Sequence, residues 1–442
     1  MQRARREGRR RQPEAAAGPR PESREAEFRR RQEALAPLLL HAVLKGEAGR
    51  AEELLEQGAP CEAEVSTGAT ALVLAAATGD VALVELLLRK GADRFAQDNA
   101  GASALCMAAL RGRLAVARAL LADVPEDTAR QLLEQRTAGG ESPLLAAAKG
   151  GHREVLAFLL DSGADIRTTA ASLGGVGVLG IACRKGKAAV LQLLIDRGLS
   201  VETADGLGMR PLMHAAASGQ TATVDAVLHL APAPQMDAKD NLGLTAAMHA
   251  CWGGHLEVLK VLEKQGADLK ARDNNNNSIA WYAAASGNCP LLLHVLEKNI
   301  GLLDARNSKG RSPIYAAVKC RKAAAVTELL KQGCSIGIKD NRGWTPLAWT
   351  AANNVADMAA LLVAKGADLR ATDDEGRVPR QIAEDCGHSK LAQMFAAKAK
   401  EMLLLKPELP DLLHKLKDKS SRGGDAAAED RAVDRLAEQL GP

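Results

Sequence analysis

Aromatic side chains are scarce in this sequence, which has four Trp, two Tyr and four Phe among 442 residues. Large aromatic groups usually dominate the energetics of a deep core. Without them, Ala, Leu and Val must provide most of the buried surface. That composition favours thin layers of paired helices over a thick globular core.

Long apolar runs and a disulfide framework are also missing. No stretch has the length and apolarity of a membrane helix, and no apolar segment follows the basic start as a secretory signal would require. The eight cysteines do not form a spaced pattern, and Cys183 and Cys251 replace small residues. We therefore expect a reducing, cytoplasmic setting, with a nuclear one left open.

Charge is nearly balanced over the whole chain, with a net value of +4, which argues against a general polyanion-binding surface. Residues 1–33 are the exception, because eleven Arg oppose six Glu there. Their low apolar content predicts a basic, disordered N-terminal tail. The alternative hypothesis is a nuclear-import or nucleic-acid-binding arm, and we expect nucleic-acid contact only through this segment.

What the sequence does contain is a repeat. One glycine marks a turn between two short helical segments, and the interval between successive turns runs from 33 to 39 residues. Self-similarity at this period indicates stacked units, each of which contacts only its neighbours. The turn glycines are Gly46, Gly79, Gly112, Gly151, Gly186, Gly219, Gly254, Gly287 and Gly387, with Arg321 and Asn354 in equivalent places.

The residues Ser142 to His152 read Ser-Pro-Leu-Leu-Ala-Ala-Ala-Lys-Gly-Gly-His, and similar starts recur at Ser312 and Thr345. This pattern resembles ankyrin repeats over roughly residues 34–400. The resemblance implies an all-α repeat solenoid of about eleven helix-turn-helix units with β-hairpin-like tips, curved around a concave groove. Residues 401–442 would then form a helical or flexible C-terminal tail.

The sequence departs from the family pattern in one position throughout. The motif His is absent, and its hydrogen bonds are expected to be replaced by packing or lost. Its place is taken by Leu40, Val73, Cys106, Leu145, Gly180, Met213, Met248, Trp281, Tyr315, Ala348 and Gln381.

Three local features give further expectations. The glycine-rich stretch Gly174–Gly180 predicts a hinge between two halves of the array, because each Gly weakens a helix by about 1 kcal/mol. The longest interval predicts an inserted helix within 124–136, capped by Asp123 and packed through Leu132 and Leu133. Asn276 stands where other tips have Gly, so a positive φ is expected there.

No motif for catalysis or phosphate binding is recognisable. His249 with Cys251, and Cys386 with His388, are isolated pairs without the further ligands that a zinc site needs. We therefore predict a non-enzymatic protein with no cofactor and no metal site.

Recognition of a partner protein is the remaining function. The resemblance implies that partners meet the tips and the outer ends of the first helices, which places Trp252 and Trp344 on the groove. Nearby cations are Lys309, Arg311, Lys319 and Arg342. We predict a monomeric scaffold or adaptor whose groove binds an acidic segment with an apolar anchor. The alternative is that these indoles, like Trp281, Tyr282, Tyr315 and Trp349, only fill space.

Overall fold

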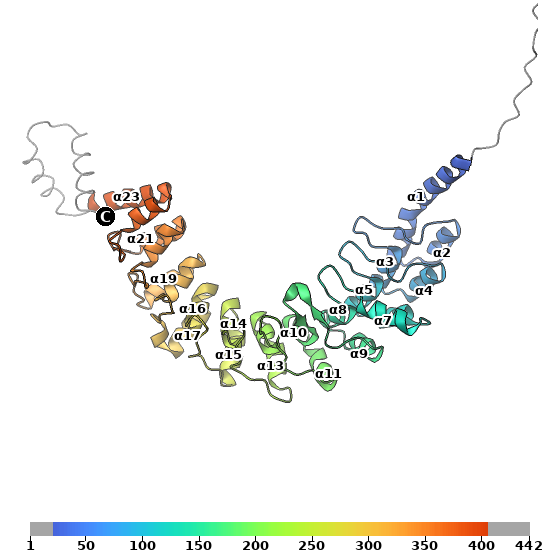
Figure 1. Cartoon of the computed structure of the whole chain (residues 1–442), viewed down its shortest axis with the longest axis horizontal. Coiled ribbons are helices and arrows are strands. Elements are labelled where there is room, and N and C mark those ends of the chain that lie inside the picture. The colour runs from blue at the N-terminus through green and yellow to red at the C-terminus, as the bar shows by residue number, and fades with distance from the viewer. Residues whose placement is uncertain (1–20, 405–442) are drawn as a thin grey trace, which may run out of the picture. The chain divides into compact units, whose positions relative to one another are not determined.

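The computed structural model describes residues 21–404, and their regular structure is almost entirely helical, with short turns and loops between the helices. The chain divides into two compact units, residues 1–178 and 179–442. Within each unit the helices form two layers, which confirms an all-α repeat solenoid (Figure 1).

The first unit carries four helix pairs. Its first-layer helices are α1 (Pro21–Lys45), α3 (Ala71–Thr78), α5 (Ala104–Arg111) and α8 (Pro143–Gly150). Their second-layer partners are α2 (Ala48–Glu56), α4 (Val81–Arg89), α6 (Leu114–Leu121) and α9 (Arg153–Asp161). The additional elements are α7 (Glu126–Glu134), η1 (Ala171–Leu173), and the strands β1 (Thr169–Ala170) and β2 (Val176–Gly177). The two strands pair antiparallel, Thr169 with Gly177 and Ala170 with Val176.

The second unit continues the same arrangement. Its first-layer helices are α10 (Val178–Arg184), α12 (Pro211–Ala217), α14 (Ala246–Gly253), α16 (Ile279–Ser286), α18 (Pro313–Lys319), α20 (Pro346–Ala352) and α22 (Pro379–Asp385). The second layer holds η2 (Ala188–Val190) with α11 (Leu191–Asp196), then α13 (Thr221–Leu228), α15 (Leu256–Lys264), α17 (Cys289–Lys298), η3 (Ile300–Leu302), α19 (Ala323–Lys331), α21 (Ala356–Ala364) and α23 (Ser389–Leu404). Each first-layer helix from α12 to α22 packs on the next.

The pair α3 and α4 shows why these sequences fold this way. Thr70 and Asp80 cap the two helices with their side chains, and Gly79 ends the first one at a φ of 91°. Ala75 and Ala76 are fully buried, so the backbones of neighbouring first-layer helices approach closely. Leucine and valine on the second helix supply the apolar area, at roughly 1.5–3 kcal/mol for each fully buried side chain.

Three local predictions can be compared with the structure. The inserted helix is present as α7, and its Leu132 and Leu133 are buried. The predicted cap is wrong, because Pro125 occupies the N-cap and Asp123 lies in the left-handed region at φ 53°. Asn276 has the expected positive φ, 62°.

The N-terminal segment differs from expectation. Helix α1 begins at Pro21 and runs across the boundary expected after residue 33, so the disordered tail is wrong for residues 21–33. Residues 1–20 and 405–442 lie outside the described part of the chain. The division between the two units falls between Val178 and Leu179, within the glycine-rich stretch expected to separate two halves.

Candidate functional site

The tip between consecutive helix pairs is a four-residue turn organised by its first side chain. In the tip that begins at Asp240, Oδ1 accepts hydrogen bonds from the backbone N–H groups of Leu242 and Leu244, at 2.9 and 2.8 Å. Gly243 closes the turn at a φ of 80°. The same pair of bonds recurs at Asp98, Asp205, Asp273, Asn307, Asp340 and Asp373.

Successive tips are joined by hydrogen bonds. The backbone N–H of Asn274 donates to the carbonyl of Leu242 at 3.0 Å, and its side-chain amide donates to the carbonyl of Asn241 at 3.0 Å. Equivalent backbone bonds join Asn241 to Leu207, Ser308 to Asn275, Asn341 to Lys309 and Asp374 to Arg342. The tips of the second unit therefore form one continuous ladder.

In two of these tips the second carboxylate oxygen is held by a histidine of the following helix, α12 or α14. Nε2 of His214 donates to Asp205, and Nε2 of His249 donates to Asp240, both at 2.9 Å. A carboxylate only accepts, so Nε2 carries the proton in both rings. These histidines lie one position beyond the expected motif His. The polar contacts are thus supplied by a neighbouring residue, and the expectation of packing or loss is wrong here.

Burial and these hydrogen bonds shift the pKa values of His214 and Asp240. Burial lowers the pKa of His214 below its ordinary value, although Asp205 opposes that shift. Burial raises the pKa of Asp240, but the hydrogen bonds from His249 and two backbone N–H groups outweigh it and hold that pKa below the usual range. The Asp240 carboxylate is therefore built to stay ionised inside its tip.

Three further tips use other donors. The hydroxyl of Tyr282 donates to Asp273, and burial raises the pKa of that hydroxyl well above its ordinary value. Arg311 reaches the next tip, where Nε donates to Asp340 at 3.0 Å. Nε1 of Trp344 donates to Asp373 at 3.2 Å. Arg311 and Trp344, both candidates for partner binding, thus already support neighbouring tips.

Trp252 is the most exposed of the candidate aromatic residues. It lies near the end of α14, 55% of its surface is accessible, and its ring stacks on Tyr282 with centroids 5.7 Å apart and an interplanar angle of 28°. Tyr282 is buried and held at its hydroxyl. The indole is therefore presented on a fixed support.

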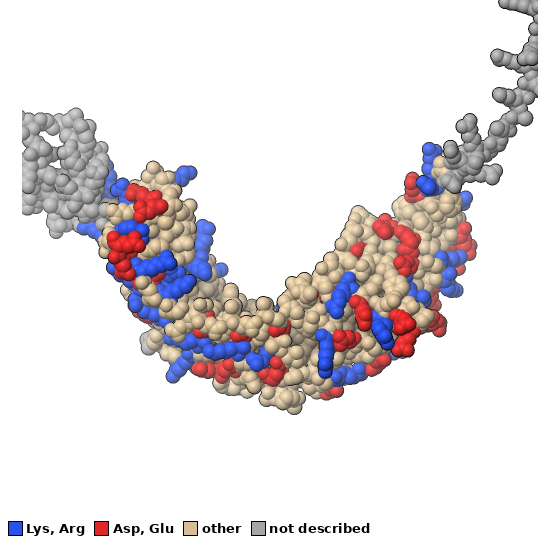
Figure 2. All heavy atoms as spheres, viewed as in Figure 1, with Lys and Arg blue, Asp and Glu red and all other residues tan. Residues whose placement is uncertain are grey.

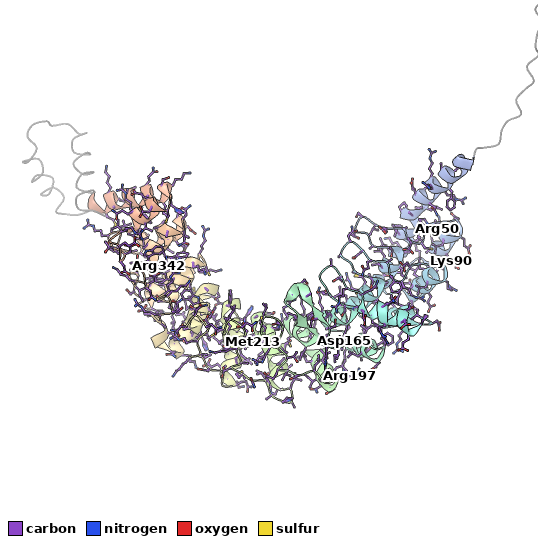
Figure 3. All side chains as sticks on the ribbon, in the orientation of Figure 1. Arg50, Lys90, Asp165, Arg197, Met213 and Arg342 are labelled. Atoms are coloured by element: carbon purple, nitrogen blue, oxygen red, sulfur yellow. The ribbon has the colours of Figure 1, made fainter. Side chains whose placement is uncertain are left out.

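Lys309, Lys319 and Arg342 are exposed. Arg342 lies over the Trp344 ring, with Cζ 5.5 Å from the centroid. Among the described residues, neither lysine has an ion-pair partner. Figure 2 shows blue side chains gathered near α19 and α21 in the second unit, and Figure 3 labels Arg342.

The remaining aromatic residues lie deeper. Tyr315 is buried, and its hydroxyl donates to the carbonyl of Ile338 at 2.8 Å. Trp281 and Trp349 are half-buried. This placement agrees with a packing role for these residues.

The His–Cys pairs have structural surroundings. His249 is held by Asp240, and burial raises the pKa of the Cys251 thiol far above its ordinary value. Cys386 is exposed at the end of α22. Within residues 21–404, no group of three or more potential ligands is assembled for a metal ion. No helix in the described range has the length and apolarity for crossing a bilayer.

The sequence that forms these helix pairs and tips matches a known family of repeats. A model of three consecutive ankyrin repeats matches residues 39–128, 179–273, 212–300 and 314–403, and a single-repeat model matches residues 139–170. The chain belongs to the ankyrin-repeat family. Ankyrin repeats are protein–protein interaction modules, generally without catalytic activity.

Individual relatives match over shorter stretches. The nuclear factor NF-kappa-B p105 subunit of Gallus gallus is 29% identical over 145 residues, which are 32% of this chain and 15% of that protein. Ankyrin repeat domain-containing protein 63 of Mus musculus is 32% identical over 108 residues, 24% of this chain and 27% of the relative. Palmitoyltransferase AKR1 of Saccharomyces cerevisiae is 28% identical over 206 residues, 38% and 27% respectively. The chain therefore spans well under half of each relative.

Proposed function

We propose that this ankyrin-repeat protein is a non-enzymatic scaffold or adaptor that binds an acidic partner segment bearing an apolar anchor. The binding surface is formed by α14, α16, α18 and α20 together with their tips. The observation that carries the proposal is Trp252, an exposed indole on a buried, hydrogen-bonded tyrosine. Rigid aromatic groups of this kind are enriched at the energetic centres of protein interfaces.

Lys309, Lys319 and Arg342 supply the charge in this proposal. They are exposed, and the two lysines have no carboxylate partner within residues 21–404. Such cations accelerate the encounter with an acidic segment and make it sensitive to salt. Arg311 is removed from the predicted contact set, because its guanidinium already pairs with Asp340.

The test is selection of a random peptide library on the full chain. Enriched peptides should combine acidic residues with an apolar one, and Trp252→Ala should weaken their binding by ~2 kcal/mol, or about thirtyfold. Phe95→Ala is the matched control, since Phe95 is an exposed aromatic residue of the first unit. Peptides that bind the Trp252 variant and the unchanged chain equally well would refute the proposed surface.

The competing hypothesis assigns function to the Arg-rich segment 1–33, as a nuclear or nucleic-acid-associated regulator. A chain without residues 1–33 separates the two hypotheses. The scaffold hypothesis predicts unchanged affinity for the selected peptides, whereas the competing one predicts loss of a steeply salt-dependent activity.

A further inference from the structure

The third residue of each tip in the second unit occupies a repeated, outward position. We refer to these residues as the tip row. In chain order the tip row is Leu207, Leu242, Asn275, Lys309, Arg342 and Glu375. All six are exposed, and the ladder of backbone hydrogen bonds sets their order in space.

Backbone N–H and carbonyl groups of the tip row already form hydrogen bonds within the protein. The N–H of Leu242 donates to Asp240 at 2.9 Å, and its carbonyl accepts from Asn274 at 3.0 Å. The N–H of Lys309 likewise donates to Asn307, and its carbonyl accepts from Asn341. A partner therefore cannot add to the row as a β-strand, because that mode needs free backbone groups. Recognition must go through side chains.

Those side chains change character along the row. Leu207 and Leu242 are 55% and 58% accessible, and they occupy adjacent tips. Lys309 and Arg342 occupy the next adjacent pair after Asn275. The final residue, Glu375, pairs with Arg377, with Oε2 and Nη1 3.0 Å apart, and the same guanidinium also pairs with Asp373 and Asp385. The row thus begins with an apolar pair and, before Glu375, carries a cationic pair.

A second set of cations reinforces the charge of these tips. Lys239, Arg306 and Lys339 each donate to a backbone carbonyl 33 residues further along, at 2.7, 2.6 and 2.6 Å. Because a carbonyl carries no net charge, these bonds fix the side chains without neutralising them. Arg306 and Lys339 therefore add positive charge close to Lys309 and Arg342, which favours an acidic partner at that part of the row.

We infer that the tip row binds one extended segment of a partner protein, with two apolar residues at one end and two acidic residues at the other. The inference rests on the proposed scaffold function and specifies the partner's pattern. Packed helices lie about 8–10 Å apart, and an extended chain advances about 3.3 Å per residue. Residues about three apart in the partner therefore meet neighbouring positions of the row.

The probe is a fluorescein-labelled thirteen-residue peptide with Leu at its first and fourth positions and Glu at its tenth and thirteenth, in an otherwise Ser/Gly/Ala background. An interleaved peptide of identical composition, with Leu and Glu alternating at those positions, is the matched control. Fluorescence anisotropy with the full chain should show at least tenfold tighter binding of the segregated peptide. Equal affinity for the two peptides, or no binding of either, would overturn the inference.

Variants of the chain test each pair of the row. Leu242→Ser should weaken binding of the segregated peptide at least tenfold. The double variant Lys309→Glu/Arg342→Glu should do the same and should bind a peptide carrying Lys in place of both Glu. Ala100→Glu, at the same tip position in the first unit, should change nothing, and circular dichroism checks that every variant is folded.

The outcomes also separate this inference from the proposed function. If Leu242→Ser binds the library-selected peptides normally but Trp252→Ala does not, the scaffold surface stands and the tip row is wrong. If both kinds of variant bind every peptide normally, both proposals fail. If Lys309→Glu/Arg342→Glu does not bind the peptide that carries Lys in place of Glu, the assignment of Lys309 and Arg342 to the acidic residues of the partner is rejected.

Discussion

At the scale of single residues, the buried tip carboxylate is the group on which the local structure depends. Its two oxygens perform different tasks: one organises the turn, and the other accepts from a side chain elsewhere in the array. Asp205 shows both, because Oδ1 accepts from two backbone N–H groups and Oδ2 accepts from His214. Loss of either partner would leave a buried charge incompletely satisfied.

The His214–Asp205 pair makes stability depend on pH. The folded pKa of His214 is lowered by burial, next to Arg184 and His249, so the unfolded chain binds the proton more readily. Stability should be fully present above the ordinary His value of about 6.5 and decline as pH falls below it. His214→Gln keeps a donor to Asp205 but does not titrate. Urea midpoints measured from pH 7.5 to 5 should fall less in this variant.

A pH profile that is equally steep in the unchanged chain and in His214→Gln would contradict this assignment. His229→Gln is a suitable control, because His229 is exposed. Its replacement should leave the profile unchanged.

Gly243 tests the close approach of neighbouring tips. A Cβ atom there would lie 2.4 Å from Oδ1 and 2.7 Å from the backbone N of Asn274. Gly266 also has a positive φ, 91°, but a Cβ there would meet nothing within 4 Å. Both changes to Ala should destabilise the protein through backbone strain, and Gly243→Ala should cost more. Thermal unfolding of the two variants gives the comparison, and equal losses would exclude the clash.

At the scale of elements, serine at the N-cap of a first-layer helix forms a capping hydrogen bond in one repeat and lacks it in another. Ser103 begins α5 and accepts from the N–H of Cys106 at 3.4 Å. Ser278 begins α16, but its hydroxyl has no hydrogen-bond partner within residues 21–404. Both side chains are buried. The two serines therefore form a matched pair.

Ser103→Ala should lower stability by about 1 kcal/mol, the usual cost of losing a helix cap. Ser278→Ala should be neutral or stabilising, because it removes a buried hydroxyl that lacks a partner. Chemical denaturation measures both. A larger loss at Ser278 than at Ser103 would show that the assigned caps are wrong.

Sequence periodicity predicts the helices well and their side-chain partners poorly. The turn glycines, α7 and the conformation of Asn276 follow from local residue preferences, which act over a few positions. The cap of α7 is missed because Asp123 adopts a left-handed conformation. The contacts of Arg311 with Asp340 and of Trp344 with Asp373 span 29 residues, and no local signal specifies which oxygen such a side chain reaches.

At the scale of the whole molecule, the chain consists of two units that meet in sequence at a glycine-rich segment. Gly174 and Gly175 both have positive φ and follow the short η1 turn. The segment offers only one short pair of strands in place of a regular tip. We predict that it is less stable than its neighbours.

Native-state hydrogen exchange tests this prediction directly. Amides of residues 171–177 should exchange faster than those of α8 and α12, because local opening there breaks few hydrogen bonds and exposes little apolar surface. Gly177→Ala, where a Cβ would meet nothing within 4 Å, should slow this exchange by stiffening the backbone, whereas Gly175→Ala would be strained at its positive φ. Exchange as slow as in the flanking helices would show that the segment is not a hinge.

The crowded alanines between neighbouring helices leave the array little freedom to vary there, while the third position of each tip projects outward with its peptide groups already satisfied. The residues that determine the fold are therefore different from those that would determine the proposed binding preference. Exchanging only Leu207, Leu242, Lys309 and Arg342 should redirect the protein to a new target without redesigning the frame that holds them.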